Sequence, residues 1–249
     1  MKLHRTLFPL LLAPHVSSVG ADTVQIAVAA NFAAPAQKIA SEFERQSEHK
    51  AVIATGSTGK FYAQIMNGAP FEVLLAADDE TPARLEKEKH AQPGSRYTYA
   101  IGKLVLWSPK PDLIDNTEGV LHKAAFRHLS IANPKVAPYG AAAVQTLRSL
   151  KLYERVQDRL VTGENIAQTH QFVASGNAEL GFVAYSQVLK EGRLEGSVWQ
   201  VPQALYSPIR QDAVLLSKGR GNKAAAAFLD FLKSSPKARE IILSYGYSL

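Results

Sequence analysis

Short apolar runs alternate with segments of helical periodicity along the chain. Of all features of the sequence, this alternation most restricts the folds that the chain can adopt. Apolar runs suited to buried strands lie at 24–30, 51–54 and 73–77, and segments with apolar residues at helical spacing follow the first two. Strands that alternate with helices are typical of domains built on parallel sheets. The first part of the chain is therefore predicted to be an α/β unit.

The same pattern starts again after residue 100, which indicates a second α/β unit. Strands are expected there at 101–107, 129–132, near Leu160 and at 180–184, with helices at 141–150 and 167–175. A strand at 209–216 and helices at 223–233 and up to Tyr245 complete the pattern. With a return segment near 205–212, this order predicts two lobes joined by two crossings. Lobe I would take residues 22–102 plus 211–249, and lobe II would take residues 103–210.

The first 21 residues have the composition of a secretory signal peptide. Lys2 and Arg5 give a cationic start, an apolar stretch follows at 7–16, and small residues come before Ala21. This apolar stretch is about ten residues long, whereas a membrane-spanning helix needs roughly 20. We therefore expect cleavage after about Ala21 and a secreted mature protein.

The composition and the motifs exclude several classes of protein. Without cysteine, the chain cannot carry a catalytic thiolate, a cysteine-ligated zinc ion or an iron–sulfur cluster. The formal charge of +6 is spread without a run of like charges, so no nucleic-acid partner is expected. The histidines lack paired zinc spacing, no Gly-x-Ser-x-Gly hydrolase motif occurs, and the acidic residues 78–80 fit a strand-end turn better than a calcium loop. No catalytic residue and no cation site is predicted.

The most informative positions are the joints between a strand and the helix that follows it. Small or hydroxyl-bearing residues occupy four such joints, at 30–33, 56–60, 138–140 and 163–166. A helix N-terminus offers free backbone N–H groups and the positive end of the helix dipole, which suit an anion. Ligands of open α/β sheets bind at the carboxyl ends of strands, so joints from both lobes could face one another across a cleft. Any one joint alone remains an ordinary helix cap.

The segment GSTGK at 56–60 invites comparison with the phosphate-binding loop of nucleotide-binding proteins. That motif requires a glycine five positions before Gly59 and a hydroxyl residue after the lysine, whereas this chain has Ala54 and Phe61 there. The nucleotide-binding interpretation is therefore excluded. An enzyme that acts on a phosphate ester stays as an alternative from another class, although the sequence contains no evident base or metal ligands for it.

An ordered set of short motifs resembles the periplasmic molybdate-binding proteins of ABC transporters. The motifs are VAANF at 28–32, GSTGK at 56–60, QIMNGAP at 64–70, AAD at 76–78, PYG at 138–140, LGFV at 180–183, AAAFLDFLK at 225–233 and YGY at 245–247. Together they span essentially all of the mature chain. The resemblance implies the type II periplasmic binding protein fold, in which two α/β lobes are joined by a two-segment hinge with the ligand cleft between them. It also implies a monomer without a cofactor that docks on a membrane permease.

The resemblance further implies that hydroxyls and backbone N–H groups hold the ligand, without a balancing Arg or Lys. Carried over by motif, the residues that bind the oxyanion are Ala30, Asn31, Ser57, Thr58, Tyr139 and Ile166. The side-chain NH₂ of Asn31 is expected to donate where many relatives have a serine hydroxyl. Some relatives place a tyrosine at the position of Ala184, whereas here Tyr185 comes one residue later. Whether Tyr185 or Lys60 reaches the ligand stays open.

A lining made of donors alone favours a fully ionised tetrahedral dianion. Protonated phosphate is disfavoured because its proton would find no acceptor. The expected ligand is molybdate, together with tungstate. A protein for another oxyanion, such as sulfate or phosphate, is the alternative within the binding class, since the size of the cavity must separate molybdate from sulfate.

Overall fold

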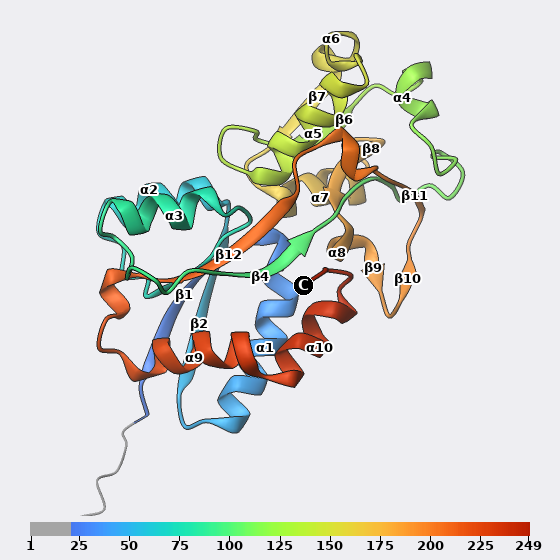
Figure 1. Ribbon diagram of the computed structural model, residues 1–249. Coiled ribbons are helices and arrows are strands. Elements are labelled where there is room, and N and C mark those ends of the chain that lie inside the picture. Colours follow the sequence, from blue (N-terminus) through green and yellow to red (C-terminus); the bar gives the residue numbers. More distant parts are fainter. Residues whose placement is uncertain (1–20) are drawn as a thin grey trace, which may run out of the picture.

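The computed structural model describes residues 21–249, which form two α/β lobes, each built around a five-stranded mixed sheet. Figure 1 shows the two lobes one above the other, with α1, α2, α3, α9 and α10 around the first sheet and α4 to α8 around the second. Apart from Ala21, the predicted signal segment 1–21 lies outside the described residues. Within those residues, no helix is long and apolar enough to cross a membrane. The predicted two-lobed α/β architecture is confirmed.

Lobe I is organised by a sheet in the order β2-β1-β3-β12-β4. Its strands are β1 (Thr23–Ala29), β2 (Lys50–Gly56), β3 (Val73–Leu75), β4 (Tyr97–Gly102) and β12 (Ile209–Leu215). β1 pairs in parallel with β2 and β3, whereas β12 runs antiparallel between β3 and β4. A strand from late in the chain therefore completes the sheet that the first residues begin.

Helices cover both faces of this sheet because apolar side chains of its strands point alternately to opposite sides. In β1, Val24, Ile26 and Val28 pack with α1, α9 and α10, while Ala27 packs on the other face with α2 and α3. The helices are α1 (Ala33–Gln46), α2 (Thr58–Met66), α3 (Glu80–Lys87), α9 (Lys223–Ser234) and α10 (Pro236–Ser244). The sequence pattern does not predict α3, because that helix buries only two side chains.

Lobe II is built on a second sheet in the order β11-β5-β8-β6-β7. Its strands are β5 (Leu104–Ser108), β6 (Leu129–Ala132), β7 (Leu160–Gly163), β8 (Leu180–Ala184) and β11 (Ser197–Gln200). Its helices are α4 (Gly119–Lys123), α5 (Pro138–Ser149), α6 (Tyr153–Val156), α7 (Ile166–Ala174) and α8 (Tyr185–Val188). A small hairpin of β9 (Leu189–Lys190) and β10 (Arg193–Leu194) projects from this lobe (Figure 1). Because β6 runs parallel to β7, the carboxyl ends of both strands lie at the same edge of the sheet.

The single strand predicted at 101–107 is wrong. This segment contains the end of β4 and most of β5, which belong to different sheets, and Lys103 between them is the first crossing between the lobes. Apolar residues on both sides of Gly102 and Lys103 favour a strand, so the pattern gives no sign that the two sides belong to different sheets. Gly102 marks that point in the structure, because a side chain there would collide with the hydroxyl of Tyr139 from lobe II.

Most other predicted elements lie within a few residues of the observed ones. The strands expected at 129–132 and 180–184 coincide with β6 and β8. Helix α5 begins at Pro138 instead of 141, because proline fits the first turn of a helix, where its missing N–H costs nothing. The second crossing runs through 201–208, and β12 begins at Ile209, two residues before the predicted lobe boundary at 211.

Two buried serines in lobe II differ in whether their hydroxyl groups are hydrogen-bonded. Ser130 in β6 and Ser108 in β5 are both fully buried. The Ser108 hydroxyl donates to the carbonyl of Glu179 at 2.7 Å, whereas the Ser130 hydroxyl has no hydrogen-bond partner among residues 21–249. A buried hydroxyl without a partner costs about 1–3 kcal/mol. Ser130→Ala is therefore expected to raise the free energy of unfolding by about 1 kcal/mol.

The matched variant Ser108→Ala removes a satisfied hydroxyl and is expected to lower the free energy of unfolding by about 1 kcal/mol. Urea denaturation of both variants, with the slope of the transition checked against wild type, measures the two signs. A loss of stability in Ser130→Ala as large as that in Ser108→Ala would contradict the assignment of Ser130 as an unsatisfied group.

Candidate ligand-binding site

The four joints identified in the sequence meet in one small cavity between the lobes. Two of them follow β1 and β2 of lobe I and two follow β6 and β7 of lobe II, so each lies at the carboxyl end of a parallel strand. The residues that line this cavity are Ala29, Ala30, Asn31, Gly56, Ser57, Thr58, Ala77, Ala137, Pro138, Tyr139, Asn165 and Ile166. The structure therefore brings all six predicted site residues together.

Each joint presents backbone N–H groups at the start of a helix, where they have no partner within the helix itself. In lobe I, Ala30 begins a 3-10 turn that runs into α1, and Ser57 is the N-cap residue of α2. In lobe II, Tyr139 is the second residue of α5 and Ile166 is the first residue of α7. The N–H groups of Thr58, Tyr139 and Ile166 find no acceptor within residues 21–249. The cavity thus gathers unpaired donors and the positive ends of helix dipoles.

Ser57 carries the clearest sign of a ligand. Its side chain is buried, yet its hydroxyl does not cap α2 and has no hydrogen-bond partner in the described part of the chain. By contrast, the side chain of Asn165, the N-cap residue of α7, accepts from the N–H groups of Ala167 and Gln168 at 3.0 Å each. Buried hydroxyls without a partner are uncommon in native proteins. The Ser57 hydroxyl is therefore free to bond to a molecule in the cavity.

The Thr58 hydroxyl also keeps a proton to donate. Its oxygen accepts a hydrogen bond from the N–H of Ala77 at 2.9 Å. A hydroxyl has two lone pairs and one proton, so this bond uses a lone pair and leaves the proton free. Ala77 itself lines the cavity and is missed as a site residue by the sequence analysis, although it stands in the AAD motif that follows the third strand.

The side chain of Asn31, which is predicted to donate to the ligand, is hydrogen-bonded inside the protein. Its Nδ2 donates to Oε1 of Gln211 at 2.8 Å and to the hydroxyl of Tyr247 at 3.0 Å, which uses both amide hydrogens inside the protein. Those partners lie 180 and 216 residues away along the chain, so no local pattern reveals them. The backbone N–H groups of Ala30 and Asn31, which have no acceptor in the described residues, remain as donors at this joint.

A buried polar network extends from this joint and connects the lobes. The Gln211 side chain donates to the hydroxyl of Tyr139 at 3.3 Å. The carbonyl of Asn31 accepts from the hydroxyls of Tyr247 at 2.7 Å and of Ser186, in lobe II, at 3.1 Å. Burial raises the pKa of Tyr139 well above its ordinary value and that of Tyr247 to about 12. Both hydroxyls therefore keep their protons and hold the network in place.

Lys60 and Tyr185, which the sequence leaves open, do not line the cavity. The ammonium of Lys60 pairs with the carboxylate of Glu164 in lobe II at 2.8 Å, and both side chains are largely exposed. The ring of Tyr185 packs against Gly246, and the ammonium of Lys103 lies 5.7 Å from its centre. Lys60 thus links the two lobes, and Tyr185 belongs to the packing around the hinge.

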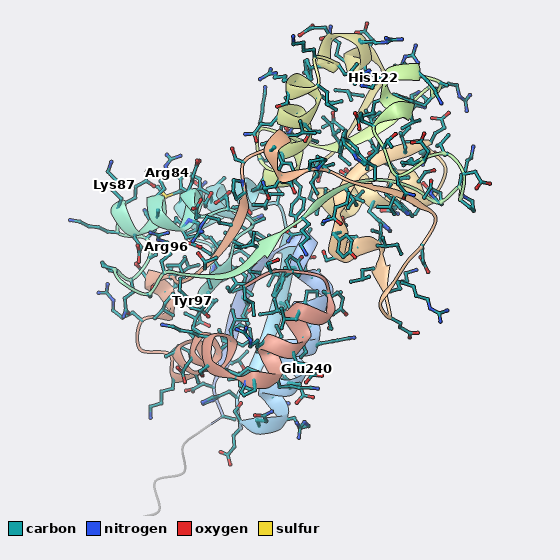
Figure 2. All side chains as sticks on the ribbon, turned by 45° about the vertical axis from the view of Figure 1, so that its right-hand side comes forward. Arg84, Lys87, Arg96, Tyr97, His122 and Glu240 are labelled. Atoms are coloured by element: carbon teal, nitrogen blue, oxygen red, sulfur yellow. The ribbon has the colours of Figure 1, made fainter. Side chains whose placement is uncertain are left out.

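The cavity carries no countercharge, because none of the residues that line it within the described chain is charged. Charged side chains such as Lys87 of α3 and Glu240 of α10 are exposed on the outside of lobe I (Figure 2). An anion in this cavity would therefore be neutralised by dipoles and hydrogen bonds instead of by an ion pair.

The strand-end turn predicted at 78–80 is a bend at Asp78 and Asp79, whereas Glu80 is already the first residue of α3. The carboxylate of Asp78 accepts from the N–H of Thr81 at 2.8 Å and from its hydroxyl at 3.2 Å. Asp78 lies in a separate, wider groove between the lobes, where burial raises its pKa to about 6. Within residues 21–249, no group of three or more His, Cys, Asp or Glu side chains could hold a metal ion.

The lobes are closed on one another around the cavity. The N–H of Gly59, in the first turn of α2, donates to the carbonyl of Val136 in lobe II at 2.9 Å. A side chain at position 59 would start only 2.9 Å from the Cα of Val136, closer than such atoms approach one another. Joints from both lobes therefore surround the cavity only in this closed arrangement.

Comparisons with known proteins agree with this geometry. Residues 24–248 match the family described as bacterial extracellular solute-binding protein. The chain is 63% identical over 227 residues to the molybdate-binding protein ModA of Azotobacter vinelandii, which covers 91% of this chain and 90% of that protein. It is 53% identical over 228 residues to the molybdate-binding protein ModA of Rhodobacter capsulatus, which covers 91% of this chain and 88% of the relative.

The fold is also shared with a solved structure. The periplasmic molybdate-binding protein of Azotobacter vinelandii superposes on 91% of this chain and 99% of its own, with a TM-score of 0.88 at 43% identity. The sequence match, the two-lobed fold and the cavity between the lobes therefore lead to one conclusion. This chain belongs to the family of bacterial extracellular solute-binding proteins, in the group of the molybdate-binding proteins.

Proposed function

We propose that this chain is a periplasmic solute-binding protein that captures molybdate and delivers it to the membrane permease of an ABC transporter. The names of its relatives and the fold support this function. The observation that carries it is the hydroxyl of Ser57, which is buried without a partner among residues 21–249. The other donors in the cavity are the hydroxyl of Thr58 and N–H groups that have no acceptor in the same part of the chain. A cavity built in this way attracts an anion and offers nothing to a cation.

Uncharged donors are sufficient for a dianion in a closed cavity. A hydrogen bond to an ionised group is roughly twice as strong as one between neutral groups. Each helix N-terminus adds about 0.3–1 kcal/mol of attraction for negative charge, and more when partly buried. Because no buried ion pair has to be broken, the anion can leave when the lobes part. Rapid release is what a protein that hands its ligand to a permease requires.

In this proposal the anion is surrounded by donors from both lobes. They are the hydroxyls of Ser57 and Thr58 and the N–H groups of Ala30, Asn31, Thr58, Tyr139 and Ile166. Lys103 and residues 201–208 form the hinge about which the lobes close. Tungstate, which has nearly the size and the charge of molybdate, is bound as well. The protein acts as a monomer in the periplasm after cleavage of its signal peptide near Ala21.

Sulfate or phosphate is the alternative ligand. Phosphate carries a proton at neutral pH, and a lining of donors leaves that proton without an acceptor. Sulfate has the same charge and shape as molybdate but is smaller, so the two differ only in how well they fill the cavity. An enzyme acting on a phosphate ester is disfavoured, because the lining offers neither a general base nor a charged group.

A thermal melt with molybdate, tungstate, sulfate, phosphate or no anion tests the ligand. At about 1,000 times its dissociation constant, a ligand adds roughly 4 kcal/mol to the free energy of unfolding. For a chain of this length, the midpoint is expected to rise by about 10 °C with molybdate and tungstate. An equal rise with sulfate would widen the ligand class to tetrahedral dianions. No rise with any of the anions would disprove the proposal.

Ser57→Ala tests whether this serine binds the anion or only begins a helix. We expect the variant to bind molybdate about 1.5–3 kcal/mol more weakly, as for the loss of a hydrogen bond to a charged group. Its stability without ligand should not fall, because the hydroxyl has no partner among the residues that the structure describes.

The matched control is Ser235→Ala, at the N-cap of α10, where the side chain accepts from the N–H of Ala238. This variant should lose about 1 kcal/mol of stability and keep its affinity. Titration calorimetry measures the molybdate affinity of both variants, and urea denaturation measures their free energy of unfolding without ligand. If Ser57→Ala binds molybdate as tightly as wild type, Ser57 does not bind the anion and only begins helix α2.

Gly59→Ala tests the closed state. An added methyl group at this position meets Val136 of lobe II, whose Cα, Cβ and carbonyl oxygen are the three nearest atoms. This contact is lost when the lobes separate. Overpacking of this kind costs about 1–3 kcal/mol, so molybdate affinity should fall by about tenfold or more. Alanine favours a helix over glycine, so the ligand-free variant should be as stable as wild type or more so. Unchanged affinity in calorimetry would argue against closure at this contact.

A further inference from the structure

Strand β12 buries two polar side chains in succession, Gln211 and Asp212, although neighbours in a regular strand point to opposite faces. The pairing of β12 with β4 shifts register between these two residues, as in a β-bulge. Bulges redirect side chains and are frequent next to functional sites. The residue left without a partner at this shift is Tyr99 of β4. Asp212 bonds to Arg96 and Thr98 inside lobe I, whereas Gln211 reaches residues of both lobes.

The amide of Gln211 joins the two halves of the cavity, although Gln211 does not line it. Its oxygen accepts from Nδ2 of Asn31, in the lobe I half, at 2.8 Å. Its nitrogen donates to the hydroxyl of Tyr139, in the lobe II half, at 3.3 Å. The hydroxyl of Tyr99 also contacts the amide oxygen at 3.1 Å, so the amide is held from a third side. One planar group of fixed size therefore spans from one half of the cavity to the other.

The surrounding backbone is shaped around this link. Gly102, next to the first crossing, leaves room for the hydroxyl of Tyr139, and a side chain there would collide both with that hydroxyl and with Nε2 of Gln211. Gln211 itself follows the second crossing by three residues and is fully buried. The link thus lies where both crossings enter lobe I, which is where a small change in geometry moves one lobe relative to the other.

We propose that Gln211 is a positioning residue that sets the distance between the two halves of the anion cavity, and through it the size of anion that the closed protein prefers. This inference rests on the proposed function. Tetrahedral dianions present the same charge and the same acceptors, so a lining of donors separates them by fit. A residue that fixes the distance between the donors of lobe I and those of lobe II therefore governs how strongly the protein prefers one anion over another.

Gln211→Met tests the inference, because methionine has a similar length but makes neither amide bond. Competition titrations with molybdate, sulfate and tungstate give the affinity ratios at one ionic strength. We expect molybdate affinity to fall by about tenfold or more, the value of one buried hydrogen bond. The ratio of molybdate to sulfate affinity should shrink by about fivefold or more, because a released cavity adapts to the smaller anion. The ratio of molybdate to tungstate should stay unchanged, since these anions are almost equal in size.

Asp212→Asn is the matched control. It alters the neighbouring buried side chain, whose partners Arg96 and Thr98 both belong to lobe I. We expect a lower free energy of unfolding with a molybdate-to-sulfate ratio within about twofold of wild type. If changes in this strand acted only through stability, the molybdate-to-sulfate ratio would change equally in both variants. A ratio that changes only in Gln211→Met therefore supports the positioning role.

Tyr139→Phe provides a second, milder variant if Gln211→Met fails to fold. It keeps the ring and the backbone N–H at the cavity and removes only the hydroxyl that receives the Gln211 bond. The molybdate-to-sulfate ratio should shrink in the same direction. A folded Gln211→Met or Tyr139→Phe protein with the wild-type ratio overturns the inference while leaving the proposed function intact. A wild-type protein that binds none of the three anions overturns both.

Discussion

An anion with two charges can lie inside a protein without a balancing cation only if hydrogen-bond donors replace the water that it loses. A helix start supplies only a few free N–H groups, so a single joint is not enough. Parallel strands bring two joints to one edge of a sheet, and a second lobe contributes two more. The hydroxyls of Ser57 and Thr58 add to this set. The two-lobed architecture is thus the simplest way to enclose such an anion.

The sequence predicts the local features well, because they depend on neighbouring residues. Strands at 129–132 and 180–184 and the four joints follow from periodicity and from the residues that begin helices. It predicts one strand at 101–107 across the lobe boundary that it places after residue 102, because the apolar residues on both sides of Gly102 and Lys103 together resemble one strand. It also does not reveal that the amide of Asn31 is used by Gln211, because that contact spans 180 residues. The sequence predicts which residues surround the cavity. It does not predict which of their groups face the cavity as donors and which are bonded within the protein.

The contacts that close the lobes differ in what they contribute. The exposed pair of Lys60 and Glu164 is solvated, and such pairs add at most about 1 kcal/mol. The buried bonds made by Ser186 and Gln211 cannot exchange with water while the lobes are closed, so leaving one unmade is expensive. Surface pairs therefore tune how readily the protein closes, whereas the buried bonds define the geometry of the closed form. In our proposal, the selectivity for one anion over another depends on these buried bonds.

The position of β12 in the first sheet has a consequence for the way in which the chain folds. Lobe II is one continuous stretch, and all of its strands are available once residue 200 has emerged. Lobe I has to wait for β12, which fills the place between β3 and β4, and for α9 and α10, which cover one face. Contacts between such distant segments form slowly. The first sheet therefore cannot be completed until synthesis has passed Leu215, near the end of the chain.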